Sequence, residues 1–175
     1  MKHGLLAAAI SVVVLTVGWL GNRGDVAERA DDVHYHAAFL VVTDDGVADF
    51  SAPAFMHLKP CTEDAHAELT PEEEQRERIH LHDGNGTVAH VHREGVRWSE
   101  LFTTLQYVFP GPPYLYRDGA AVAESTFTPV QIDDRVLIVA TTNDPTPELV
   151  AEWTAQVPTI EDIRAAESVS EGCGS

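Results

Sequence analysis

The spacing of hydrophobic residues changes along this 175-residue chain between the period of a strand and the period of a helix. These changes predict short strands separated by short helices. The run from His34 to Thr43 is rich in apolar and β-branched residues and ends at the turn sequence D-D-G. Residues 47–51 can pair back on this run, so we expect residues 34–51 to form a β-hairpin. Both faces of the first strand are apolar beyond His36, which predicts a central position in a sheet.

Local capping chemistry marks the starts of the helices. Thr70 begins the sequence T-P-E-E, which is the pattern of a capping box with proline at the first helical position. The strand pattern that resumes near Ile79 keeps this helix short. Ser99 is the expected N-cap of a second helix, and Thr146 begins a third. A fourth helical segment is expected over residues 159–166.

Further strands follow in the pattern of the second half. We expect residues 79–92 to form a hairpin around the turn sequence D-G-N-G, because glycine and asparagine accept positive φ angles. Residues 114–117 and 121–124 are expected to form another hairpin. Residues 135–140 form the last strong strand of the prediction.

The order of these elements predicts an α+β fold. The part from Trp98 to Ala140 holds a helix, the sequence Y-R-D-G and then the strand D-D-R-V-L-I-V. This arrangement resembles a β-grasp (ubiquitin-like) domain, in which a hairpin packs on one helix and the last strand follows an acidic turn. The resemblance implies a mixed sheet with one main packing helix over residues 34–142.

The N-terminus is typical of a membrane-directed segment. Lys2 precedes an apolar run from Gly4 to Gly21 that carries no charge. The length of this run is at the lower limit for a spanning helix and is long for the core of a signal peptide. Residues 1–24 are therefore expected to be a transmembrane anchor or a cleaved signal. Lys2 places the N-terminus in the cytoplasm and the rest of the chain outside it.

The remaining chain divides by composition into three parts. Residues 25–33 are polar and predict a short linker. Residues 34–142 form the expected histidine-rich domain, and residues 143–175 a C-terminal helical extension with a tail. The predicted location is the cell membrane, with the domain extracytoplasmic, or a secreted protein if the signal is cleaved.

The chain is strongly acidic. Its net charge is -17, and residues 1–24 hold two of the 11 basic residues and none of the 28 acidic ones. Such a charge excludes nucleic acid and anionic membrane surfaces as partners, because both attract clusters of Lys and Arg. Only Lys2 and Lys59 are lysines, which is typical of salt-adapted proteins and also compatible with an ordinary acidic secreted protein.

Three His-x-His pairs are the most specific chemical feature of the sequence. A strand has a side-chain period of two, so each pair places both imidazoles on one face. Two of the pairs flank the D-G-N-G turn, and the length of that turn decides whether they share a face. The sequence leaves both registers open. The pairs are His34/His36, His80/His82 and His90/His92.

Clustered imidazoles on strands predict a transition-metal site for copper or zinc. Copper would be favoured if Met56 or Cys61 supplied a sulfur ligand. Asp83 or Glu94 could orient a ligand through a hydrogen bond. The expected ligands are the six paired histidines, with His57, Cys61 and His66 as further candidates from the loop that precedes the first helix.

The same histidines carry a family resemblance. His34 begins the motif H-Y-H-A, and His80 begins the motif H-x-H-D. Both motifs resemble those of a group of small exported, membrane-anchored prokaryotic proteins. The resemblance has no settled activity to transfer and implies the fold more than the function.

Other interpretations stay open at the level of sequence. The histidines could form a polar cross-strand ladder, as part of an interaction module or of an accessory subunit with a membrane-protein partner. They could form a pH-sensitive face. A His-ligated zinc enzyme is a third possibility, although no H-E-x-x-H, G-x-S-x-G or phosphate-loop motif occurs. Cys61 and Cys173 could form a disulfide.

Overall fold

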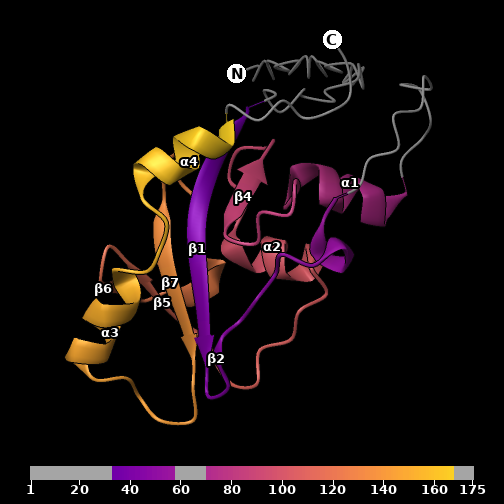
Figure 1. Cartoon of the computed structure of the whole chain (residues 1–175). Helices are drawn as coiled ribbons and strands as arrows, with labels where there is room; N and C mark the ends of the chain where they lie inside the picture. The colour runs from indigo at the N-terminus through magenta and orange to yellow at the C-terminus, as the bar shows by residue number, and fades with distance from the viewer. Residues whose placement is uncertain (1–32, 58–69, 168–175) are drawn as a thin grey trace, which may run out of the picture.

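The computed structural model describes residues 33–57 and 70–167, which form a mixed α+β fold with seven strands and four α-helices (Figure 1). The strands are β1 (Tyr35–Thr43), β2 (Gly46–Val47), β3 (Ile79–His80), β4 (Val88–Val91), β5 (Tyr114–Arg117), β6 (Ala120–Val122) and β7 (Arg135–Ala140). The helices are α1 (Pro71–Arg78), α2 (Trp98–Thr104), α3 (Pro147–Thr154) and α4 (Ile160–Glu167), with short 3-10 turns at Pro53–Phe55 and Ser125–Phe127.

The sheet has the order β3-β4-β1-β7-β5-β6, with β2 paired to the end of β1. The first and last strands, β1 and β7, are parallel neighbours at its centre, and the other pairs are antiparallel. The structure confirms the expected hairpins at β1/β2, β3/β4 and β5/β6. It also confirms that β1 lies centrally, because a strand pairs with it along each edge.

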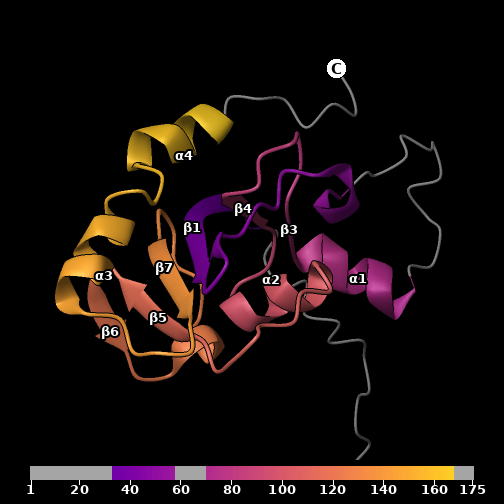
Figure 2. The ribbon, with the colours of Figure 1, turned by 60° about the horizontal axis from the view of Figure 1, so that its bottom comes forward.

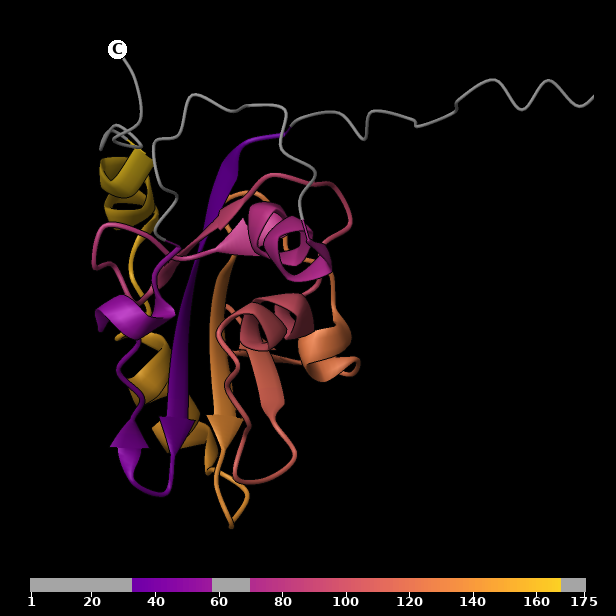
Figure 3. The same ribbon diagram turned by 90° about the vertical axis from the view of Figure 1, so that its right-hand side faces the viewer.

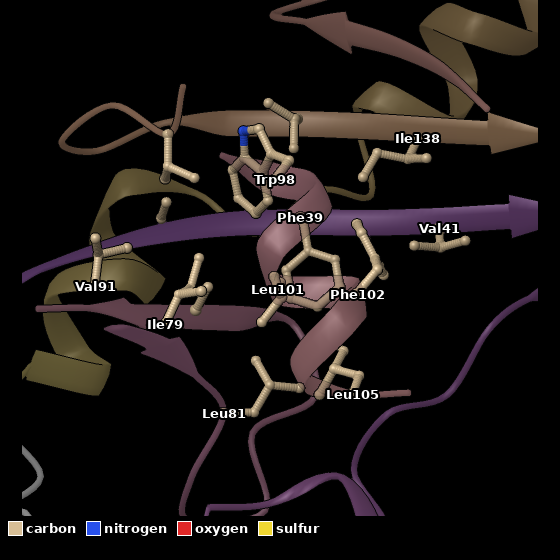
Figure 4. Close-up of a cluster of buried hydrophobic side chains, with 14 of the residues drawn as sticks. Phe39, Val41, Ile79, Leu81, Val91, Trp98, Leu101, Phe102, Leu105 and Ile138 are labelled. Atoms are coloured by element: carbon tan, nitrogen blue, oxygen red, sulfur yellow. The ribbon is translucent and has the colours of Figure 1, made fainter. Parts of the chain in front are cut away.

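Helices cover both faces of the sheet, with α2 on one face and α3 and α4 on the other (Figures 2 and 3), and a hydrophobic layer lies on each face. On one face, alternate β1 residues such as Phe39 and Val41 pack against the buried side of α2, which contributes Trp98 and Leu101 (Figure 4). On the other face, the intervening β1 positions and β7 pack against the two C-terminal helices. That second layer consists of Ala38, Leu40, Val42, Leu137, Val139, Val150, Val157 and Ile163.

Capping chemistry fixes the helix starts much as expected. Thr70 caps α1 with a capping box, in which its hydroxyl accepts from the Glu73 N–H at 3.3 Å and its own N–H donates to the Glu73 carboxylate at 2.7 Å. Thr146 likewise caps α3. The expectation for Ser99 is wrong. The N-cap of α2 is Arg97, whose N–H donates to the Glu100 carboxylate at 3.1 Å.

The earlier start of α2 has a tertiary cause. Trp98, its first residue, is fully buried, and its indole N–H donates to the Asp134 carboxylate at 3.2 Å. The same carboxylate accepts from the Arg117 Nε at 2.6 Å. A partner 36 residues away thus decides where the helix begins.

Several expectations lie outside the described residues. These are the anchor or signal and most of the linker, together with Cys61, His66 and Cys173. In the part of the chain that the structure describes, no helix is both long and apolar enough to cross a bilayer.

Candidate metal centre

The register of the histidine hairpin places its imidazoles on one face of the sheet. His80 lies directly opposite His90 in the β3/β4 pair, and His36 lies directly opposite His90 in the β1/β4 pair. Of the two registers left open by the D-G-N-G turn, the protein adopts the one that brings the pairs together. The three strands therefore present one cross-strand row of histidines, with His90 in the middle.

The remaining histidines extend this row into an array. His34 and His92 stack next to the row, with ring centroids 4.9 Å apart and an interplanar angle of 8°. His57 joins at the β3 edge. Its backbone N–H donates to the Leu81 carbonyl, and its ring centroid lies 4.6 Å from that of His80. All six paired histidines and one of the three further candidates are thus brought together. The array consists of His34, His36, His57, His80, His82, His90 and His92.

The tightest contacts of the array meet at one nitrogen. The Nδ1 atom of His90 lies 2.6 Å from the Nε2 atom of His36 and 2.6 Å from the Nε2 atom of His82. A neutral imidazole has one N–H and one lone pair, so a single nitrogen cannot serve two such neighbours fully by hydrogen bonding alone. A cation between the three rings could instead accept the lone pairs of the His90 Nδ1, His36 Nε2 and His82 Nε2 atoms.

Ligand atoms from two strands converge closely enough to hold a metal ion. Nitrogen atoms of His34, His36 and His90 all lie within 4.8 Å of one another. His82 reaches the same group through its contact with His90. We call His34, His36, His82 and His90 the central group. It contains four imidazoles, and three or four is the usual number of protein ligands around zinc.

Asp83 orients one member of the central group. Its carboxylate lies 2.5 Å from the Nδ1 atom of His82, while the Nε2 atom of that ring is directed at His90. A carboxylate on the far nitrogen fixes the tautomer of a metal-bound histidine and raises its basicity. Asp83 has a φ of 57°, a left-handed conformation that aspartate tolerates better than most residues. The expected supporting contact from Asp83 is present.

Burial keeps the core of the array neutral. Removal from water, with smaller contributions from the neighbouring imidazoles His57, His92 and His82, lowers the pKa of His80 to about 3. Burial lowers the pKa of His90 even more strongly, reinforced by His36 and His82. Neutral imidazole is the metal-binding form, so these rings keep their lone pairs at neutral pH and well below it.

The outer histidines have partners that the sequence did not suggest. The His80 Nδ1 donates to the Arg76 carbonyl at the end of α1, at 2.7 Å, because a charged ring is disfavoured here and the carbonyl can only accept. The His57 Nε2 lies 3.3 Å from the Glu77 carboxylate. The first contact joins residues only four apart, whereas the second depends on how α1 docks beside His57, so no local motif could have revealed the second.

Sulfur is absent from the described part of the array. Met56, the only sulfur-bearing residue among positions 33–57 and 70–167, packs against the hydrophobic layer under α2, on the opposite side from His57. The condition under which Met56 would favour copper is therefore not met by its side chain. Cys61 lies outside the described residues.

An apolar groove lies away from the histidines. It has a volume of about 760 Å³ and lies between the end of α2 and the Ser125–Phe127 turn, lined by Phe102, Tyr107, Phe109 and Pro112 among others. It contains no histidine and no acidic residue, so it has no metal-binding chemistry of its own.

Comparison with known proteins adds no assignment to this geometry. Protein-family models, curated proteins and solved structures were searched, and none matches the chain.

Proposed function

We propose that this protein binds a transition-metal ion, zinc or copper, through the central group of histidines. The observation that carries the proposal is the convergence of nitrogen atoms from His34, His36 and His90 within 4.8 Å. Two more observations support it: the 2.6 Å contact of His82 with the same His90 nitrogen, and the Asp83 carboxylate behind His82. Burial of His90 lowers the pKa of its ring, so this ligand offers a lone pair without first losing a proton.

The donor set favours a divalent ion. Imidazole nitrogen suits Zn²⁺ and Cu²⁺, whereas Cu⁺ prefers the softer sulfur of cysteine or methionine. Met56 packs against the hydrophobic layer under α2, and the ligand atoms that converge are imidazole nitrogens. Zinc needs no change of oxidation state, and a tetrahedral set of three or four imidazoles satisfies it.

The two closest nitrogen pairs of the central group would separate slightly around an ion. Two nitrogens bound to one Zn²⁺ at the usual distance and angle are roughly 3.3 Å apart, whereas the His36–His90 and His82–His90 pairs are 2.6 Å apart. Each of these two pairs would therefore have to open by less than 1 Å. For the His82–His90 pair, rotation about the side-chain torsions of His82, which lies outside the paired strand segments, can supply this movement.

The role that we propose is storage, delivery or sensing of the ion by a membrane-held, extracytoplasmic domain. Support for the location comes from the charge-free apolar run between Gly4 and Gly21 and the basic residue before it. We also propose that the domain is a β-grasp. Its support is the parallel pairing of the first and last strands at the centre of the sheet, with α2 packed over one face.

Metal analysis of the purified full-length chain tests the proposal. After loading with Zn²⁺ or Cu²⁺ and desalting, we expect one ion or more per chain in the wild type. The double variant His36→Gln/His90→Gln should lose the ion, because it removes two central ligands. Asp44→Asn is the matched control, since that exposed carboxylate binds Thr142 at the opposite end of β1. Equal metal content in wild type and double variant would contradict the proposal.

A further inference from the structure

The central group is unevenly exposed to solvent, and this asymmetry bears on how the proposed metal ion would enter and leave. His36 and His90 retain 2% of their exposed surface each, and the His82 side chain retains 11%. His34 alone in the central group is exposed. It lies one residue before β1 begins, whereas His36 and His90 lie within paired strands.

Strand pairing keeps the two inner ligands in place. On each side of the His36/His90 pair, the ladder continues with Tyr35 opposite Val91 and Ala37 opposite Ala89. Moving either ring off an ion would disturb a ladder whose other face is part of the hydrophobic core. His82 is held by its contact with Asp83. These three rings are therefore poorly placed to be displaced first.

His34 combines exposure with reach. Its ring centroid lies 4.8 Å from that of His36 and 6.0 Å from that of His90, and its ligand nitrogen belongs to the converging group. Because it precedes the first ladder pair of β1, its side chain can turn away without breaking the pairing of β1 with β4. A zinc site stays closed while all its protein ligands are bound and opens when one leaves.

On the basis of the proposed function, we propose that His34 is the exchangeable ligand of the site and that the ion enters and leaves by ligand exchange at this position. An incoming donor with a nitrogen, oxygen or sulfur lone pair forms a bond to the ion as the His34–metal bond breaks. The ion keeps its charge, and His36, His82 and His90 hold it until further donor atoms arrive. The corresponding partner is a protein or small molecule that presents such a donor at the exposed edge beside His34.

The test follows release of Zn²⁺ from the loaded full-length protein to a chelator, EDTA, at increasing chelator concentration. Exchange at an exposed ligand predicts a release rate that rises in proportion to chelator concentration. His34→Gln should bind zinc more weakly and release it at least about tenfold faster than the wild type, given that even a lost supporting contact typically weakens metal binding by 10–100-fold. His36→Gln should retain none.

Two controls keep the result interpretable. Asp44→Asn, at the far end of β1, should release zinc at the wild-type rate. The metal-free melting temperature of His34→Gln should equal that of the wild type, because the side chain is exposed.

Three outcomes separate this inference from the proposed function. A wild-type release rate that does not change with chelator concentration would overturn the inference, since release would then depend on opening of the fold. So would an unchanged release rate in His34→Gln. A wild-type protein that holds no zinc or copper would instead overturn the proposed function itself, together with the inference that depends on it.

Discussion

The two faces of the strands β1, β4 and β3 are buried to nearly the same degree but by opposite chemistry. The face under α2 presents Ala37, Ala89 and Ile79, all with no exposed surface. The opposite face presents His36, His90 and His80, with 2%, 2% and 6% of their surface exposed. Each histidine is the chain neighbour of one of these apolar residues, so a single strand register positions both sets.

This difference separates stability from binding. Burial of apolar surface contributes about 25 cal/mol per Å² to folding, so the α2 face stabilises the sheet. Burial of imidazole costs free energy unless its polar atoms gain partners. The histidine face therefore depends on the other face for its position, and an ion could repay its cost of burial. Substitutions on the two faces should accordingly have different consequences.

The largest effect on stability is expected on the apolar face. Trp98→Ala removes a fully buried side chain. Its ring centroid lies 5.9 Å from that of Phe39, and its indole N–H donates to the Asp134 carboxylate. A loss of about 3–5 kcal/mol in the free energy of unfolding is typical for such a truncation. Chemical denaturation of metal-free protein would measure it. A loss below about 1 kcal/mol would mean that α2 does not support the sheet as described.

The second largest effect is the gain in the free energy of unfolding that zinc binding should give. Zinc that binds only the folded state should raise the free energy of unfolding by about 2.7 kcal/mol when its free concentration is 100 times the dissociation constant. His90→Gln should abolish this gain while changing the metal-free stability far less than Trp98→Ala does. Melting curves with and without Zn²⁺ would show both. Equal stabilisation by zinc in the variant would place the ion elsewhere.

The third effect is the pH dependence of the metal-free protein. The pKa of His80 is about 3 when folded and near 6.5 when unfolded, so the unfolded chain binds more protons between these values. Stability is therefore full above pH 6.5 and falls as the pH decreases toward 3, by about 1.4 kcal/mol per pH unit for each such histidine. His90, whose folded pKa is also lowered, adds a contribution of the same sign.

Denaturation at several pH values tests this dependence. The slope of the free energy of unfolding against pH should become shallower in His80→Gln. The variant lacks His80, one of the two histidines that bind a proton more readily in the unfolded chain than in the folded one. A variant slope equal to that of the wild type between pH 6 and 4 would show that burial of His80 carries no such penalty.

The smallest effect on stability is expected at the carboxylate beside the site. Asp83 is exposed and contacts His82, so Asp83→Asn should leave the metal-free melting temperature unchanged. Zinc affinity should fall by roughly 10–100-fold, the usual result of losing a partner of a metal-bound histidine. Competition with a zinc indicator would measure this, with Asp44→Asn as the control. An unchanged affinity would show that Asp83 does not orient the ligand.

Local chemistry made most elements of the fold predictable. The capping residues Thr70 and Thr146 mark helix starts without help from the rest of the chain. The strand-rich runs and their turns are equally local, and all the expected hairpins form. The start of α2 was missed because burial of Trp98 and its bond to Asp134 decide it. Packing of α3 and α4 over the second face of β1 was likewise not evident from the sequence.

The site was predictable in its members and not in its geometry. The period of a strand gives the shared face within each His-x-His pair, but the relation between pairs depends on register. That register follows from a turn whose length the sequence leaves open, and from pairing of β1 with β4 across more than 50 residues. The contact of His57 with Glu77 and the packing of Met56 against the layer under α2 also depend on how distant segments dock.

X-ray absorption at the zinc edge of the loaded protein would show directly whether the central group holds the ion. We expect three or four nitrogen neighbours at roughly 2.0–2.1 Å, with the outer-shell scattering of imidazole rings and no sulfur neighbour. In His36→Gln/His90→Gln this imidazole signal should disappear. A spectrum that shows only oxygen neighbours, or sulfur at roughly 2.3 Å, or an imidazole signal that survives in the double variant, would rule out binding by the central group.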